Sequence, residues 1–479
     1  MAPAYDGGRV SEALCDLTAI ELANQYRAGE ASPIDMIEAV LARTARLNPV
    51  LNAIVTLDAA GARAAAEQSA ARWRRGEPRS ALDGVPMTVK DNLIAAGLRS
   101  TWGSRVCAGY VPDHDELPVA RLRAAGLVIV GKTNVPEFTL QGYTDNLLFG
   151  PTCNPWNPQL TPGGSSGGAV ASVAARIVPI AIGTDGGGSI RRPASHTGLV
   201  GLKPTVGRIA RADGFPVILH DFEVVGPMAR DTADVSAFMA MAAGPDPRDP
   251  ASLAWPAWSE VRNPAEGLRI LYVPAFANGP VDPEIVLSVK QAAGAFADLG
   301  HEVVVGEAPF DADEVAHAFG IVASSGLAWL MRDKEHKIDL LSQGMHTMLE
   351  AGNKVRAMDY VNALATTTRL KKRLADFFSE FDVLMTPAAA ALPWPTHESH
   401  PSTIACQPVG PRGHAVFTAF ANVAGSPALA LPCMPSSTGL PIGLQLVGPH
   451  GGDEMLLALG RTYEGKCPWR DRYPKLLEL

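Results

Sequence analysis

Apolar residues recur along the chain at spacings that predict several helices. After Ser32, a favourable N-cap, apolar side chains lie three or four positions apart until Asn48 and Pro49, which are expected to end that helix. The segment 18–21 has the sequence of a capping box, and 59–75 is alanine-rich. The first 75 residues are therefore expected to be mainly helical.

Short apolar runs then alternate with helical patterns along the rest of the chain. These runs are 85–89, 127–130, 178–182, 268–273, 303–305, 383–385 and 444–447. Strands interleaved with helices predict an α/β fold with a largely buried sheet. The length of 479 residues allows about three domains or one large α/β domain. The Pro- and Asp-rich segment 244–252 could join two domains, although a surface connection within one domain is the more ordinary interpretation.

Composition and charge narrow the class of protein. Hydrophobic residues make up 47% and charged residues 19%, which excludes a disordered chain. Forty-one basic residues against 49 acidic ones give a net charge of −8, which argues against nucleic-acid binding. Residues 1–9 contain no apolar run, so no signal peptide is expected. The most apolar stretch, 168–183, is too short and too interrupted to span a membrane.

Six cysteines are scattered along the sequence without a C-x-x-C pair. They are expected to be free thiols in a reducing compartment, mostly as small buried residues. Together with the composition, this predicts a soluble cytoplasmic protein with no membrane partner.

Two glycine-rich patterns have an ordinary structural explanation. Residues 126–133 match the phosphate-loop pattern, but the residues between the glycines are strand formers and a proline follows, so a buried strand is expected instead. Residues 163–167 match the nucleophile elbow G-x-S-x-G, but three prolines and no strand precede them. A glycine-rich turn is the favoured interpretation there.

A third glycine-rich segment, 184–191, follows the apolar run 178–182 directly. Successive glycines can adopt backbone angles that let their amides converge on one point, as an oxyanion requires. Ser189, at the end of this turn, could then attack a carbonyl whose oxygen those amides hold. The spacing alone favours an anion-binding or purely structural loop equally.

A serine nucleophile also needs a base, and the residues alone do not select one. His196 is the histidine nearest to Ser189 in sequence. A buried lysine is the other option, since burial favours the neutral amine. Lys90 lies at the end of an expected strand, and Lys132 and Lys203 have similar settings.

Several blocks of sequence taken together form a more specific pattern. They are 84–92, 131–134, 150–156, 162–168, 183–191, 201–205, 382–387, 421–427 and 441–448. With these blocks the chain resembles the amidase signature family of serine hydrolases over most of its length. The resemblance implies one α/β domain over 1–479, with a twisted mixed sheet covered by helices on both sides. A helical segment at roughly 10–75 would precede a signature core at roughly 80–245.

The resemblance also implies a catalytic set. Ser189 would be the nucleophile, Ser165 a bridging serine in a cis peptide, and Lys90 the final base. The remaining implied positions are the oxyanion amides of Gly186, Gly187 and Gly188, the bracing pair Asp185 and Arg191, and the supporting hydroxyl of Ser166. Lys132 and Lys203 match structural positions of the family. No metal or organic cofactor is implied.

The family contains free-standing amidases and the A subunit of the glutamine-dependent tRNA amidotransferase, which hydrolyses glutamine and passes ammonia to a partner. That subunit typically has Asp-Thr-Gly-Gly-Ser where this chain has Asp-Gly-Gly-Gly-Ser at 185–189. Its Asn-Leu-Ala-Arg-Tyr-Asp run is also not matched at 323–332. Both departures favour a free-standing amidase that forms an acyl-enzyme with a small-molecule linear amide. We would then expect no nucleic-acid partner, with a homodimer possible.

The substrate is expected to be apolar or aryl, as an amide, ester or carbamate. Segments 143–149, 310–332 and 389–406 lie outside the shared motifs and are candidates for the substrate pocket. Their larger apolar residues are Phe149, Phe319, Leu327, Trp329, Leu330 and Trp394.

Overall fold

An eleven-stranded mixed sheet runs through the computed structural model, which describes residues 12–259, 266–276 and 279–478. The strands are β1 (Ile54–Leu57), β2 (Pro86–Lys90), β3 (Val128–Thr133), β4 (Ile180–Asp185), β5 (Val200–Lys203), β6 (Val224–Ala229), β7 (Arg269–Tyr272), β8 (Glu302–Val305), β9 (Val383–Pro387), β12 (Ala428–Pro432) and β13 (Gly443–Val447). Their order is β1-β3-β2-β4-β6-β5-β12-β13-β9-β7-β8. A separate small hairpin pairs β10 (Thr403–Ile404) with β11 (Gln407–Pro408).

Parallel pairing is confined to two places in this sheet. The strands β3, β2 and β4 are parallel neighbours, and so are β9, β7 and β8. Antiparallel pairs connect these two groups through β6, β5, β12 and β13. The expected α/β fold with a mixed sheet is therefore confirmed.

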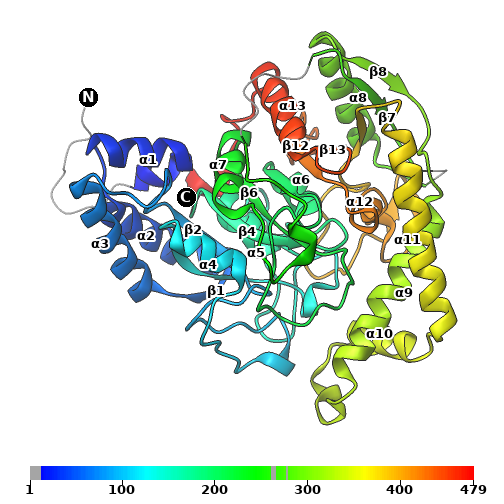
Figure 1. The fold of residues 1–479 in the computed structure, drawn as a ribbon, viewed down its shortest axis with the longest axis horizontal. Helices are drawn as coiled ribbons and strands as arrows, with labels where there is room; N and C mark the ends of the chain where they lie inside the picture. The colour runs from blue at the N-terminus through cyan, green and yellow to red at the C-terminus, as the bar shows by residue number, and fades with distance from the viewer. Residues whose placement is uncertain (1–11, 260–265, 277–278, 479) are drawn as a thin grey trace.

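The helices flank this sheet and extend beyond it. They are α1 (Ala19–Ala28), α2 (Pro33–Leu51), α3 (Ala59–Arg75), α4 (Leu117–Ala124), α5 (Gly167–Ala174), α6 (Arg191–Thr197), α7 (Thr232–Ala242), α8 (Pro283–Asp298), α9 (Ala312–Met331), α10 (Gln343–Asn353), α11 (Ala357–Phe377), α12 (Ala419–Ala424) and α13 (Asp453–Lys466). Figure 1 shows α1–α3 at one side of the molecule and α9–α11 at the other, with the sheet between them. Helices α5 and α6 pack on the central strands and on each other, while α7 and α13 form another packed pair.

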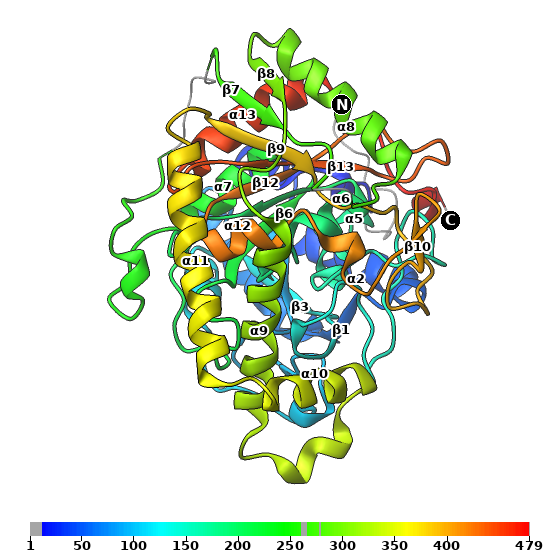
Figure 2. The same ribbon diagram turned by 90° about the vertical axis from the view of Figure 1, so that its right-hand side faces the viewer.

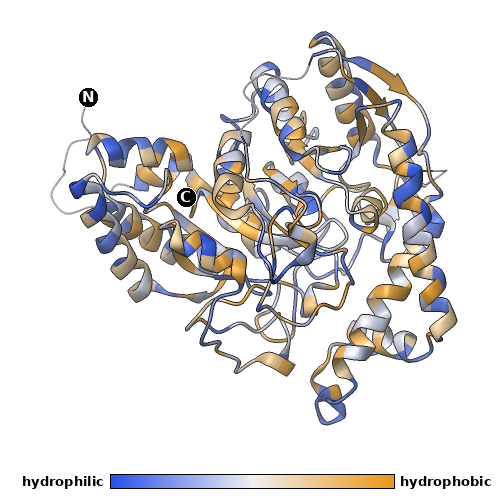
Figure 3. Ribbon diagram, in the orientation of Figure 1, coloured by the Kyte–Doolittle hydropathy of each residue, from blue (hydrophilic) through white to orange (hydrophobic). Residues whose placement is uncertain are grey.

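Buried strands explain why the apolar runs are continuous. All residues of β2, β3, β4 and β9 are buried, as expected for strands covered on both faces. In Figure 3 the helices carry both hydrophobic and hydrophilic residues, as expected for helices with one buried side. Each apolar run named above lies on a strand, with ends shifted by up to three residues.

The N-terminal helices begin where the sequence predicts. The Thr18 side chain accepts from the Glu21 amide and the Glu21 carboxylate accepts from the Thr18 amide, a complete capping box. The expected end of the next helix is wrong: α2 continues through Pro49 to Leu51, because a proline so near the C-terminus removes only one hydrogen bond of the last turn.

Two other expectations concern segments outside regular structure. The segment 244–252 lies within the single domain and ends in a 3₁₀ turn, so it does not separate two domains. Residues 1–9, for which no signal peptide is expected, lie outside the described residues.

A second apolar core lies beside the sheet, between α9, α10, α11 and α12. Figure 2 shows α9 and α11 running side by side on this side of the molecule. Helix α9 is long and apolar enough to cross a membrane by length and composition alone, but half of its apolar window is buried against these neighbours. It therefore packs as a core helix does.

Candidate active site

Two parallel strands bring the predicted base and nucleophile to the same edge of the sheet. Strand β2 ends at Lys90, and its parallel neighbour β4 ends at Asp185, four residues before Ser189. Functional groups in α/β sheets gather beyond the carboxyl ends of such strands. Lys90 and Asp185 are fully buried and Ser189 is 6% exposed.

Lys90 makes direct contact with a serine hydroxyl. Its Nζ lies 2.8 Å from Ser165 Oγ, 2.9 Å from Thr184 Oγ1 and 3.0 Å from the Thr184 carbonyl oxygen. When Lys90 is neutral, its lone pair can accept the Ser165 proton while its two N–H groups still serve Thr184. The contact with Ser165 thus suits proton exchange.

Burial favours the neutral form of Lys90. Removal of the ammonium from water lowers its pKa from 10.5 to about 7, although the charges of Glu223 and Asp185 oppose the shift. Asn92, two residues further on, donates to the same Thr184 hydroxyl. Lys90 is therefore held by a hydrogen-bond network in which no carboxylate of the described residues contacts its amine.

The turn that precedes α5 supplies Ser165 and Ser166. The Gly164–Ser165 peptide is cis, as the resemblance implies. The Ser166 amide donates to the Ser189 carbonyl oxygen at 3.2 Å, and the Ser166 hydroxyl lies 3.3 Å from the Thr184 carbonyl oxygen. Ser166 thus connects the turn that carries Ser165 to the loop that carries Ser189.

The loop 186–189 is held by a buried ion pair. Asp185 accepts from Arg191 at 2.8 and 3.0 Å, and both side chains are fully buried. Burial alone would raise the pKa of Asp185, but the Arg191 charge and its hydrogen bonds hold that pKa well below its usual range. Asn422 of α12 donates to the same carboxylate.

The amides of this loop differ in their partners. The Gly188 amide donates to Asp185 Oδ1 at 2.6 Å. Within the described part of the chain, the amides of Gly186, Gly187 and Ser189 donate no hydrogen bond. Gly188 has φ +117°, and a Cβ there would lie 2.2 Å from Thr418 Oγ1, so this turn requires glycine. The amides free to hold an oxyanion are therefore not the three expected from the glycines alone.

The other candidate bases make no hydrogen bond to Ser165 or Ser189 among the described residues. Lys132 donates to the Leu93 carbonyl and to Ser100. Lys203 also has a pKa lowered to about 7 by burial, yet it donates to the Pro204 carbonyl and contacts no serine. His196 contacts the Ala391 carbonyl. Geometry, rather than pKa, distinguishes Lys90.

A cavity of about 250 Å³ opens beside Ser189. Its wall is mainly apolar and comes from α9 and α12, with Phe310, Phe319 and Phe420 as the aromatic members. Two arginines, Arg192 and Arg412, also line it, and no motif in the sequence singles them out.

The expected pocket segments are only partly correct. Segment 310–332 lines this cavity through its first half, but neither 143–149 nor 389–406 contributes a lining residue. Phe319 is the single lining residue among the six apolar candidates. Leu327 and Leu330 are buried in the second core, and Trp329 is 47% exposed.

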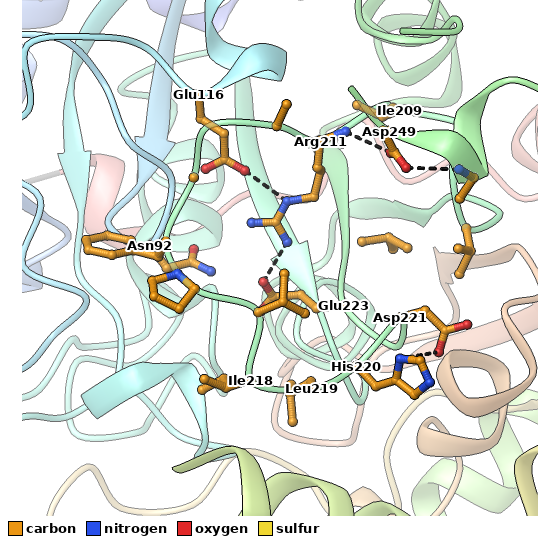
Figure 4. Close-up of a pocket in the computed structure, with 18 of the residues that line it drawn as sticks. Asn92, Glu116, Ile209, Arg211, Ile218, Leu219, His220, Asp221, Glu223 and Asp249 are labelled. Carbon is orange, nitrogen blue, oxygen red and sulfur yellow. Dashed lines mark hydrogen bonds and ion pairs between the residues drawn. The ribbon is translucent and has the colours of Figure 1, made fainter. Parts of the chain in front are cut away.

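A second cavity of about 410 Å³ lies behind Asn92. Figure 4 shows Arg211 between Glu116 and Glu223, with ion-pair distances of 2.9 and 2.7 Å. Glu223 and Leu219 also line the cavity beside Ser189, so these two side chains separate the two spaces. Within residues 12–259, 266–276 and 279–478, no group of three His, Cys, Asp or Glu side chains is placed to hold a metal ion.

The fold and this site together define an amide-hydrolysing enzyme, and comparison with known proteins identifies its family. Residues 35–457 match the Amidase family, so the chain belongs to the amidase family. The A subunit of glutamyl-tRNA(Gln) amidotransferase from Myxococcus xanthus is 35% identical, over 94% of this chain and 97% of that one. The protein of the same name from Thermosynechococcus vestitus is 33% identical, over 95% and 99%. A bacterial aryl acylamidase has the same fold, with a TM-score of 0.89, 27% identity and coverage of 96% and 98%.

These relatives overturn the preference for a free-standing amidase. Similarity over the full length outweighs the two local departures on which that preference rested. A glycine at 186 changes a side chain but keeps the loop amides, and 323–331 lies in α9, where packing constrains the sequence. The expectation of a small-molecule partner alone, without nucleic acid, is wrong for the same reason. Net charge averages over the whole surface and does not reveal which partners a protein has.

Proposed function

We propose that this chain is the glutamine-hydrolysing A subunit of a tRNA-dependent amidotransferase, with Lys90, Ser165 and Ser189 as its catalytic set. The Lys90–Ser165 contact of 2.8 Å is the observation that carries the chemistry. Identity of 33–35% over nearly the whole of the relatives named above supports this member of the family over others. The ammonia released would pass to a companion protein of the complex, and a cytoplasmic location follows as an expectation.

The reaction begins with a proton relay. Neutral Lys90 accepts a proton from Ser165, which in turn accepts one from Ser189, and Ser189 Oγ attacks the carbon of the substrate carboxamide. The relay then runs in reverse and protonates the departing nitrogen as ammonia. Water, activated by the same residues, attacks the acyl-enzyme and releases the carboxylic acid.

The amides of Gly186, Gly187 and Ser189 would hold the negative oxygen of the tetrahedral intermediate. Each such donor contributes about 10²–10³-fold to turnover in related chemistry, because it is fixed before charge develops. Asp185 and Arg191 keep this loop in place without contacting the substrate, and are positioning residues.

The test compares the purified chain alone with the chain assembled with the companion amidotransferase subunits from the same organism. Ammonia release from glutamine and conversion of glutamyl-tRNA(Gln) are measured. The proposal predicts that the assembled enzyme performs both reactions and that Ser189→Ala abolishes both. A chain that binds none of these companion subunits, leaves glutamine intact and rapidly hydrolyses aryl amides would contradict it.

A further inference from the structure

One end of the cavity beside Ser189 carries two positive charges. Arg412 lies in the turn before the 3₁₀ helix Gly413–Ala415, and Arg192 lies in the first turn of α6. Both line the cavity together with Gly187 and Ser189. Glu223 is the one other charged residue among those that line the cavity, so these guanidinium groups dominate the local electrostatics unless Glu223 neutralises them.

Arg412 has no partner for its charge. Its guanidinium stacks on Phe319, with Cζ 4.9 Å from the ring centroid. In the described segments, no carboxylate pairs with it and no oxygen accepts from its side chain. The residue is exposed and lines the cavity. An arginine stacked on an aromatic ring keeps its donors in a fixed plane, which suits binding of a carboxylate.

Arg412 also lies close to the reacting centre. A Cβ on Gly187 would be 3.6 Å from Arg412 Nη2 and 2.8 Å from Phe319 Cζ. The Arg412 guanidinium is thus directly beside an amide that would hold the oxyanion. A carboxylate attached four C–C bonds from a scissile amide carbon is roughly 5 Å away in an extended chain, a distance this geometry can span.

Arg192 adds charge but has a second task. Its Nη1 donates to the Gly187 carbonyl oxygen at 3.0 Å, and its Nη2 lies 3.4 Å from the Gly164 carbonyl oxygen. It therefore links the loop of Ser189 to the turn of Ser165. Its Nε is buried without a hydrogen-bond partner, and burial together with the nearby Arg412 charge lowers its pKa to about 9. Two unneutralised guanidiniums in one cavity favour an anion.

Glu223, the acidic residue that lines this cavity, does not neutralise Arg192 and Arg412. Glu223 is engaged by Arg211 at 2.7 Å, on the side of the second cavity. The cavity therefore combines unneutralised positive charge beside the nucleophile with a mainly apolar wall.

We propose that Arg412 binds a carboxylate of the substrate and selects amides whose acyl part carries one, with Arg192 contributing charge and positioning the two serine loops. This inference rests on the proposed function, in which that group is the α-carboxylate of glutamine. The inference extends to any ω-amide whose carboxylate lies at a similar distance from the scissile amide carbon.

The experiment uses two amides that differ in one group. Glutaramate and pentanamide have chains of equal length, ending in a carboxylate and a methyl group, and kcat and KM for ammonia release are measured for both. The chain is assayed assembled with its companion subunits and also alone. Three variants are compared with wild type: Arg412→Gln, Arg412→Lys and the control Arg332→Gln. Arg332 is a suitable control because it also stacks on an aromatic ring of α9, Trp329, but lies outside the cavity.

Wild type is expected to prefer glutaramate. Arg412→Gln should lower kcat/KM for glutaramate by about 10- to 100-fold, mainly through KM, and lower it for pentanamide far less. Arg412→Lys should recover part of the loss, and Arg332→Gln should match wild type. Equal kcat/KM for the two amides in wild type, or equal losses for both in Arg412→Gln, would overturn the inference.

A second measurement does not depend on turnover. A neutral fluorophosphonate labels the reactive serine, and glutaramate and pentanamide are compared as protecting ligands. Stronger protection by glutaramate, lost in Arg412→Gln, supports the inference, while equal protection overturns it. If glutamine is not hydrolysed but glutaramate is preferred through Arg412, the proposed function fails and the carboxylate site stands.

Discussion

The protonation of Lys90 should set the lower pH limit of activity. Its pKa of about 7 means that about half of the amine is neutral at pH 7 and about a tenth at pH 6. At the ordinary value of 10.5, only about 0.03% would be neutral at pH 7. Burial of this side chain therefore increases the reactive fraction at neutral pH by roughly a thousandfold.

The charge of Glu223 provides a way to move this limit. It is the strongest charge that opposes deprotonation of Lys90, whereas Arg211 favours it. Replacing Glu223 by glutamine removes the negative charge and leaves Arg211 less compensated, so the pKa of Lys90 should fall further. The acidic limb of the pH–rate profile should then shift to lower pH.

The assay is kcat/KM for ammonia release from pH 5 to 9, for wild type and Glu223→Gln, with Glu302→Gln as the control. Glu302 is also paired with an arginine, but it lies on the edge strand β8. Wild type should lose about tenfold for each pH unit below the limit. A profile that is flat to pH 5, or a limb that shifts upward in Glu223→Gln, would refute the role given to Lys90.

Three further substitutions test the loop and the core. Asp185→Asn leaves Arg191 buried without its counter-charge, so the free energy of unfolding in denaturant should fall by roughly 3 kcal/mol and turnover should drop. The control is Asp359→Asn, in the surface pair with Arg356, which should change the free energy of unfolding little. Gly187→Ala places a methyl group 2.8 Å from Phe319 Cζ and should reduce kcat sharply. Gly187→Ala combined with Phe319→Leu should recover part of the lost kcat. If kcat does not recover, crowding against Phe319 is not the cause of the loss. Leu431→Ala in the fully buried strand β12 should lower the free energy of unfolding by about 2–5 kcal/mol. Leu287 is 58% exposed, so Leu287→Ala should lower it by less than about 0.5 kcal/mol. Equal losses for the two variants would contradict the assigned core.

Strands with continuous apolar runs could be predicted from the sequence, but strands that carry glycine or proline could not. Strand β6 contains Gly226 and Pro227, residues that ordinarily argue against a strand. A Cβ at position 226 would lie 2.2 Å from the Leu202 carbonyl oxygen of β5, so close approach of the two strands requires glycine there. That requirement arises only in the assembled sheet.

The candidate site likewise contains residues that the sequence predicts and one that it does not. Local signals and family motifs indicate Lys90, Ser165 and Ser189, because each lies in a distinctive run of residues. Arg412 could not be found in this way: it lies more than 200 residues from Ser189 in an ordinary turn, and it reaches the site through packing on Phe319. The full-length relatives, rather than the loop sequence at 185–189, overturn the preference for a free-standing amidase.

The most direct test of the lysine relay is the rate at which a fluorophosphonate modifies Ser189 in Lys90→Met, which keeps an apolar side chain of similar length but removes the amine. The serine that reacts with a fluorophosphonate, forming an Oγ–P bond as fluoride leaves, is identified by mass spectrometry, and the thermal unfolding transition confirms that the variant is folded. We expect a loss of about 10²–10⁴-fold both in the rate of this modification and in ammonia release. A folded Lys90→Met protein that labels Ser189 and turns over substrate at close to the wild-type rate would contradict a lysine-driven relay.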